Sequence, residues 1–338
     1  MYEQAALQIL QHSFAELSIQ DTVRKSTRMG LPPENLLISF NMIVKDVMDK
    51  LSGSYNSHRR NVVEFSGSPT IVIAKVWELI VENNDGSVEL NKEHFLWALH
   101  YMKECPNFAV LCTTMKNSRR GSPCKNTVLK WVWFYVYEIR ELEHRVIVWE
   151  NRKTNDRGDD CLISVDATDC AFQQILINNP EKPGKKMINK ALYSFKLNGP
   201  GLRYEIGLSL LSNDIVWING PFCPGDWNDL EIFRHDLMHK LEPGERVEAD
   251  NIYTSEAAFV VTPKSLTTKE EQLAMMKRVE GRHEALNKHV KNWKCIKDNY
   301  RVKGTAMEKM EKHGTLFRAC AIVKQVAMQM GVGELYDV

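Results

Sequence analysis

The front of the chain repeats apolar residues at intervals of three and four, which is the pattern of helices that bury one face. Ser68 followed by Pro69 is typical of a helix start, because a hydroxyl caps free amide groups and proline fits the first turn. A short helix and a basic turn are expected between the last two of these helices. The expected ranges are 36–51, 69–83, 91–104 and 126–143.

From residue 145 the pattern changes to short apolar runs that are rich in β-forming residues and divided by turn residues. The expected strands are 145–149, 161–168, 191–197, 203–211, 214–220 and 245–250. The expected helices are 225–241, 268–293 and 305–331, the last interrupted near Gly314. This alternation predicts a mixed α/β domain over 145–338, preceded by an all-helical region over 1–144.

Charge indicates a possible binding surface in only one segment of the chain. The 338 residues carry a net charge of +1, so the chain as a whole indicates no polyanionic partner. Between residues 264 and 303, however, eleven Lys and Arg face five Asp and Glu, a local charge of +6. No apolar run approaches the roughly 18 residues of a membrane span. The eight cysteines form no CxxC pair or common zinc spacing, which favours a reducing compartment.

Three acids in the second half stand out by their positions. Asp166 interrupts an apolar strand, where a carboxylate is costly to bury unless it is paired or binds a cation. Asp250 ends another strand, and Glu284 lies inside the basic helix. If the three meet at one edge of a sheet, they repel one another, and divalent ions that prefer oxygen ligands relieve this repulsion. Lys288 and Lys291 follow Glu284 at helical spacing and suit a phosphate backbone.

Five stretches resemble DDE-type DNA transposases of the Harbinger-like and bacterial insertion-sequence kind, over a little more than half of the chain. They are "VDATDCAF", "NGPFCPGDWNDLEIFR", "VEADNIY", "GRHEALNKHVKNW" and "HGTLFRACAIVKQ". The resemblance implies a ribonuclease-H-like domain: a mixed sheet with flanking helices. It implies that Asp166, Asp250 and Glu284 bind two Mg²⁺ or Mn²⁺ ions for cutting and joining DNA. Ala167 departs from the family's usual glycine after the first acid.

The resemblance also implies partners. We expect DNA, as element ends and target, and a homodimer; a nuclear location follows in a eukaryotic host and a cytoplasmic one otherwise. Arg282, Lys288 and Lys291 are expected to hold backbone phosphate. The helical region before residue 145, with Arg119 and Arg120 in its basic turn, is compatible with a helix-turn-helix that recognises the element ends.

Several alternatives remain open at this level. Asp169 competes with Asp166 as the first acid, and Glu280 competes with Glu284 as the third. His283 fits either an acid–base role or a surface position, and Tyr253 either contacts a nucleotide or packs in a turn. For the whole chain, the alternatives are a nuclease without strand transfer, a domesticated transposase that binds DNA without cutting, and a structural interaction module with no metal site.

Overall fold

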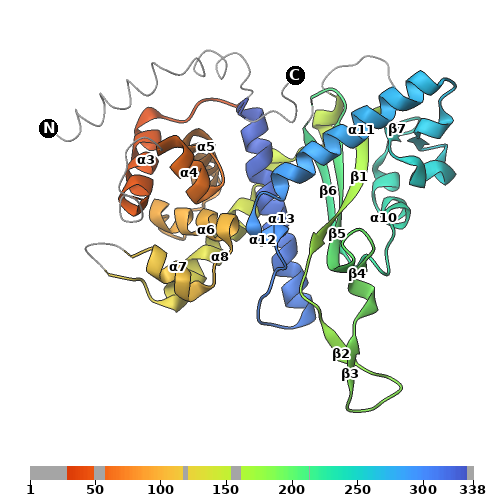
Figure 1. The fold of residues 1–338 in the computed structure, drawn as a ribbon. Helices are drawn as coiled ribbons and strands as arrows, with labels where there is room; N and C mark the ends of the chain where they lie inside the picture. Colours follow the sequence, from red (N-terminus) through yellow and green to blue (C-terminus); the bar gives the residue numbers. More distant parts are fainter. Residues whose placement is uncertain (1–28, 49–57, 117–120, 154–160, 213, 333–338) are drawn as a thin grey trace. The chain divides into compact units, whose positions relative to one another are not determined.

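The computed structural model describes residues 29–48, 58–116, 121–153, 161–212 and 214–332 (Figure 1). These residues divide into two compact units. One contains the described residues up to Leu142 and those from Ile322 onward, and the other contains Glu143–Ala321. No helix among the described residues is long and apolar enough to cross a lipid bilayer.

The first unit is built from helices that enclose an aromatic core. Trp77 lies 5.6 Å from Phe95 and 6.1 Å from Tyr135, measured between ring centroids. The short helix expected before the basic turn is present as α7, whereas the turn itself, with Arg119 and Arg120, lies outside the described residues. The helices are α3 Glu34–Met48, α4 His58–Ser66, α5 Thr70–Asn83, α6 Lys92–Glu104, α7 Phe108–Thr114 and α8 Lys125–Glu141.

One detail of the expected helix start is wrong. Pro69, not Ser68, occupies the N-cap of α5, and no side chain caps this helix. The carbonyl of Ser68 instead accepts a hydrogen bond from the Ser66 hydroxyl, which holds the turn that leads into the helix. The sequence signal therefore located the helix to within one residue but misassigned the role of the serine.

The second unit contains a mixed sheet flanked by helices, so the predicted α/β class is confirmed. Its strand order is β4-β5-β1-β7-β8. The remaining strand, β6, pairs with β5 on the side away from β1. β1 is antiparallel to β5 and parallel to β7, and β7 is parallel to β8. The strands are β1 Cys161–Ala171, β4 Tyr193–Ser194, β5 Gly199–Ser209, β6 Ile215–Phe222, β7 Arg246–Glu248 and β8 Val260–Val261; β2 Leu176–Asn178 and β3 Lys186–Ile188 form a separate hairpin.

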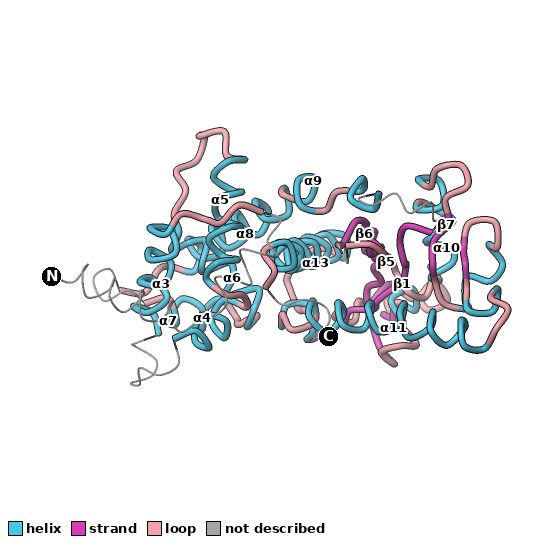
Figure 2. Tube along the Cα trace, turned by 90° about the horizontal axis from the view of Figure 1, so that it is seen from above, coloured by secondary structure: helices cyan, strands magenta, loops and turns pink. Residues whose placement is uncertain are grey.

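The two faces of the sheet carry different helices. Side chains alternate along a strand, so Ile163 and Val165 of β1 point to one face. There they pack with Phe233 of α10 Asp229–His235. Ser164 points to the other face, where it meets α11 Lys269–Val290. Figure 2 shows α11 running along one side of the strands. A position on β1 therefore determines which helix its side chain faces.

The apolar run at 145–149 is not a strand. It belongs to the helix α9 Glu143–Val146 and to the 3₁₀ helix η1 Trp149–Lys153. The Arg152 guanidinium lies 4.1 Å from the Trp149 ring and is fully buried, where it donates to Glu245 at 2.8 Å. The two residues of this buried ion pair are far apart in sequence. The helical turn that places Arg152 beside Glu245 is therefore not indicated by the apolar pattern alone.

The closing helix α13, Ala306–Gln329, continues through Gly314, so the expected interruption is wrong. A Cβ atom on Gly314 would lie 2.8 Å from the Cδ atom of Pro221 on β6. Glycine is present because the helix backbone approaches this strand closely, not because the helix ends. Nearby, the Phe317 ring stacks on Tyr204 of β5 with 3.8 Å between centroids.

Candidate functional site

Asp166 and Asp250 lie on neighbouring parallel strands. Asp166 is in the middle of β1, the central strand, and Asp250 follows the end of β7 by two residues. Asp250 also caps the 3₁₀ helix η4, Asn251–Glu256, since its Oδ1 atom accepts a hydrogen bond from the Ile252 amide at 2.9 Å. One Oδ atom of Asp250 is thus held in place, while its second carboxylate oxygen is available to a ligand.

The pKa values of the two acids respond to some of the same charged neighbours. Burial is the main reason that the pKa of Asp166 is raised to about 6, and the carboxylates of Asp229 and Asp250 contribute to this rise. Burial also raises the pKa of Asp250, with Asp229 adding to the effect. The Lys196 ammonium acts against both shifts. Because Asp229 raises the pKa of both acids and Asp250 also raises that of Asp166, an added cation would be favoured here.

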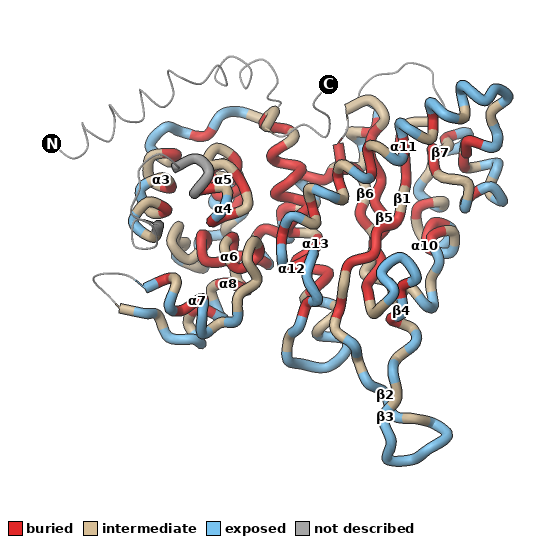
Figure 3. The backbone as a smooth tube through the Cα atoms, viewed as in Figure 1, coloured by how far each residue is buried: buried red, intermediate tan, exposed pale blue. Residues whose placement is uncertain are grey.

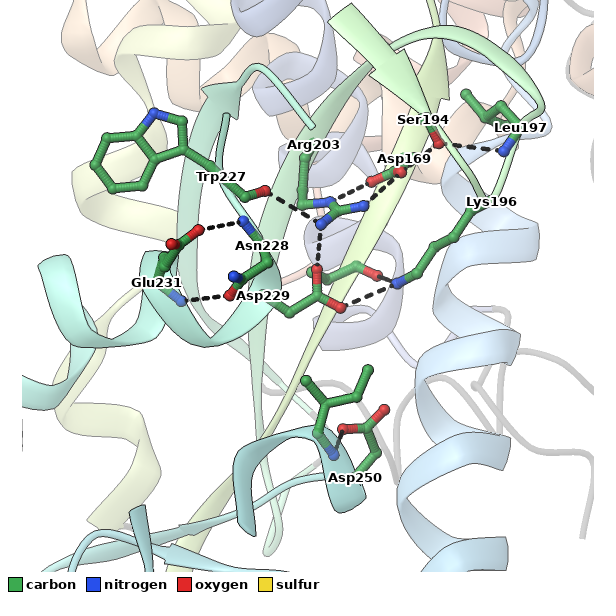
Figure 4. A network of polar contacts seen from close by, with 12 residues as sticks. Asp169, Ser194, Lys196, Leu197, Arg203, Trp227, Asn228, Asp229, Glu231 and Asp250 are labelled. Carbon is green, nitrogen blue, oxygen red and sulfur yellow. Dashed lines mark hydrogen bonds and ion pairs between the residues drawn. The ribbon is translucent and has the colours of Figure 1, made fainter. Parts of the chain in front are cut away.

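A buried ion network supports this site from the α10 face (Figure 4). Arg203 on β5 donates two hydrogen bonds to Asp169, at 2.7 and 2.8 Å, and its third nitrogen lies 2.7 Å from Asp229. Lys196 donates to the Ala167 carbonyl at 2.9 Å and to Asp229 at 3.2 Å. The Lys196 ammonium is therefore held at the backbone of Ala167, the residue that follows Asp166. From there its charge acts on both Asp166 and Asp250.

Sequence reasoning missed Lys196, Arg203 and Asp229. The signal for Asp229 was present, because "NDLEIFR" begins with an acid in the first turn of a helix, and Asn228 and Glu231 form a capping box there. No local pattern marks Lys196, in the turn between β4 and β5, or Arg203 on β5; both are positioned by the pairing of these strands.

The ion network favours Asp166 over Asp169 as the first acid of the site. Asp169 lies three residues after Asp166 and therefore points to the opposite face of the sheet. Its side chain is fully buried, and Arg203 and Ser194 lower its pKa by hydrogen bonding. Its oxygens are occupied by these partners. Asp166 is partly accessible and has the raised pKa, which favours it as the ligand-binding acid.

Helix α11 is fixed across the sheet by three contacts. Arg278 pairs with Glu248 on β7, and Arg282 donates to the Ser209 carbonyl. His283 lies 3.1 Å from the Ser164 hydroxyl. Because Asp166 is two residues beyond Ser164 on the same strand face, it faces this helix too. On α11, the Oδ1 atom of Asn287 is buried and accepts no hydrogen bond from the described residues.

Glu284 lies on the exposed side of α11, as does its alternative Glu280. Neither is buried among the other acids. Within the described part of the chain, no group of three or more His, Cys, Asp or Glu residues is close enough to hold a metal ion. The structure thus places Asp166 on β1 and Asp250 just after its parallel neighbour β7, with Glu284 on the exposed side of α11.

Among the basic residues assigned to DNA, Arg282 does not fit its expected role. It is 4 % exposed, and its guanidinium is bonded to the sheet, so it is not presented to a phosphate backbone. Lys288 is exposed on α11, and Lys291 is half-buried at the C-cap of that helix. These two lysines keep positions compatible with phosphate contact.

Two of the open alternatives are decided by burial. His283 is 2 % exposed, and burial lowers its pKa to about 3, so it is a neutral residue that joins helix and strand rather than an acid–base group or a surface histidine. Tyr253 is 1 % exposed and packs edge-on against Phe233 at 5.7 Å. It belongs to the core and does not contact a nucleotide.

Comparison with protein-family models, with curated proteins and with solved structures found no match.

The two neighbouring aspartates on β1 are expected to respond oppositely to substitution by Asn. Asp166 has a raised pKa, so its ionisation destabilises the folded state as pH rises from about 4 to 6, and that cost persists at higher pH. Asp166→Asn should therefore increase the free energy of unfolding at pH 8, by up to about 3 kcal/mol, and should have little effect near pH 4.

Asp169→Asn is the matched control. Its pKa is lowered, so its charge stabilises the fold above pH 4, and this contribution is lost as pH falls through the lowered pKa. The Asn variant should be less stable than wild type at pH 8. Urea unfolding at pH 4 and pH 8 measures both effects. Equal losses in both variants at pH 8 would contradict the assignment of the two acids.

Proposed function

We propose that this chain is a metal-dependent DNA transposase or endonuclease of the DDE type. The observation that carries the proposal is the position of Asp166 on β1 and of Asp250 just after β7, its parallel neighbour, where the Asp250 carboxylate raises the pKa of Asp166. The strand arrangement supports it: three antiparallel strands, β6-β5-β1, are continued by the parallel strands β7 and β8. This order, with acids on the central strand and after its parallel neighbour, is compatible with the ribonuclease-H-like sheet that the resemblance implies.

The donor set at this site suits a divalent cation. Mg²⁺ and Mn²⁺ prefer carboxylate oxygens, and Asp166 and Asp250 supply them from a partly buried position where both pKa values are raised. We infer that Asp166, Asp250 and Glu284 would hold two such ions, with the Glu284 side chain turning in from the exposed side of α11. When bound, the metal supplies an activated water and stabilises the leaving oxygen of the phosphodiester.

The residues of the chain would position the substrate. Lys196, 45 % exposed at its side chain, holds a positive charge beside the acids and suits the phosphate that is cut. Lys288 and Lys291 on α11 extend this positive surface toward the neighbouring phosphates of DNA. This function implies that the chain binds element ends and target DNA and that it forms a homodimer. We also propose that the helices of the first unit recognise the element ends.

One observation favours a second candidate, a domesticated transposase that binds DNA without cutting. Glu284 is exposed and lies outside the cluster of the two aspartates. If it does not complete the site when metal is added, two carboxylates and the flanking lysines still form a DNA-binding surface but support little cleavage. The position of Glu284 in the metal-bound protein separates the two candidates.

Manganese titration by calorimetry tests the proposal without knowledge of the DNA ends. Wild type is expected to bind Mn²⁺, and Asp250→Asn is expected to lose this binding. Glu284→Gln should weaken it, because a third oxygen ligand loses its charge. Glu280→Gln is the matched control, one turn earlier on the same exposed side of α11, and should bind as wild type does. Wild-type protein that binds no Mn²⁺, alone or with branched DNA, would contradict the proposal.

A further inference from the structure

We propose that the β2–β3 hairpin is an arm that binds duplex nucleic acid beside the Asp166 and Asp250 site. This inference rests on the proposed function for its partner, and adds a surface that the resemblance did not include. In the second unit the hairpin extends away from the sheet (Figure 1), and Figure 3 shows it almost entirely exposed. Its two strands, Leu176–Asn178 and Lys186–Ile188, are joined by three residue pairs.

The charge of the hairpin is one-sided. Residues 174–190 contain four lysines and one glutamate, in a chain whose total charge is only +1. All four lysines are exposed: Lys182, Lys185, Lys186 and Lys190. Lysines gathered on a projecting element favour a polyanion, and each phosphate that they neutralise releases counterions.

The hairpin also exposes apolar side chains that a purely solvated loop would not need. Leu176 is 55 % exposed, Ile177 is 40 % exposed and Ile188 is 58 % exposed. Leu176 and Ile188 form a pair on one face of the hairpin, and Ile177 lies on the other. Proteins that grip the minor groove combine cations with apolar side chains that insert between base steps. This combination is what a duplex partner would use.

The tip and the root of the hairpin are both held in place. At the tip, the Asn179 amide donates to the Lys185 carbonyl at 2.9 Å, and Lys185 donates to the Lys182 carbonyl at 3.0 Å. At the root, Phe172 pairs with Tyr300, and the Gln173 side chain accepts from the Val302 amide at 3.0 Å. An isolated two-stranded hairpin is only marginally stable in water. These contacts therefore stabilise the conformation in which the lysines are exposed.

The hairpin is covalently linked to the acid site at both ends. β1, which carries Asp166, leads directly into β2, and β3 leads back to Ser194, whose hydroxyl donates to Asp169 at 2.5 Å. Asn178 is twelve residues from Asp166, so an extended chain separates them by at most about 40 Å. This is about one turn of duplex. One DNA segment can therefore contact both places.

A second copy of the chain fits this surface less well than nucleic acid does. In a symmetric pair of hairpins the lysines of one copy would meet the same lysines of the other, and like charges oppose that contact. Lysines on exposed strands also prevent edge-to-edge strand pairing. The excess of positive charge therefore argues for a polyanion rather than for a copy of itself.

The test is binding of a fluorescent 30-base-pair duplex, measured by anisotropy in EDTA between 50 and 200 mM salt. The triple variant K182A/K185A/K186A is expected to bind about tenfold to a hundredfold more weakly, with a salt slope lower by about 2 to 3. The control Lys240→Ala removes one exposed lysine from the α10 side of the sheet and should leave both quantities unchanged. Ile188→Ser should weaken binding without changing the slope.

The outcomes separate this inference from the proposed function. A triple variant with the affinity and slope of Lys240→Ala would overturn the arm while leaving the metal site intact. Loss of DNA affinity with unchanged Mn²⁺ binding would support the arm independently of the catalytic acids. Wild type that binds neither duplex nor Mn²⁺ would overturn both. Since the hairpin lies outside the core, equal melting temperatures of variant and wild type establish that folding is unaffected.

Discussion

Asp250→Asn is expected to abolish cleavage of branched duplex DNA, lowering the single-turnover rate by about 10³-fold or more. The substitution removes the charge that a divalent ion would require but keeps an oxygen at Oδ1. The hydrogen bond from the Ile252 amide, 2.9 Å in the wild type, can therefore persist and preserve the turn. The loss is expected to be chemical and not structural.

The measurement is a single-turnover rate with Mn²⁺, alongside duplex affinity in EDTA. Asp169→Asn provides a control for the cleavage rate, because Asp169 points to the other face of the sheet. Any decrease in its rate should be explained by its lower folding stability. Asp250→Asn should bind duplex as tightly as wild type, or more tightly, since a negative charge near the phosphates is removed. Cleavage by Asp250→Asn within tenfold of the wild-type rate would exclude Asp250 as a metal ligand.

Arg203→Met is expected to lower the free energy of unfolding by about 3–5 kcal/mol. Arg203 is 8 % exposed and bridges two acids, Asp169 and Asp229, whose side chains are 0 % and 5 % exposed. Methionine fills much of the space but leaves the buried Asp169 carboxylate without a counter-charge and leaves Asp229 with Lys196 alone. Lysine would restore a charge but not the two parallel hydrogen bonds to Asp169.

Urea unfolding at pH 7 measures this effect, with Arg234→Met as the matched control. Arg234 also pairs with a carboxylate, that of Glu256, but its side chain is 47 % exposed. Water screens such a pair, so the control should lose no more than about 1 kcal/mol. Equal effects of the two substitutions would show that the Arg203 network does not stabilise the site.

Parts of the fold followed directly from local pattern. The helices at 69–83 and 91–104 appear as α5 and α6 within one residue at each end, because one face of each buries apolar side chains. The expected strand at 203–211 lies largely within β5, and Asp166 is on a strand as predicted. The strand expected at 145–149 is wrong, because a helical turn there places Arg152 in a buried pair with Glu245, 93 positions further along the chain.

The sequence by itself determined the chemical types at the site: an acid inside an apolar strand, an acid after a second strand, and a basic helix. Those features depend on residues close in the chain, which local periodicity reveals. Only the tertiary structure decided which residues share the site. Pairing of β1 with β5 placed Arg203 against Asp169, which points away from the face of Asp166, and Arg203 together with Lys196 reaches Asp229 on α10. Packing of α11 on the sheet buried Arg282 and His283 and left Glu284 exposed, because helix packing, not spacing in sequence, sets which face is covered.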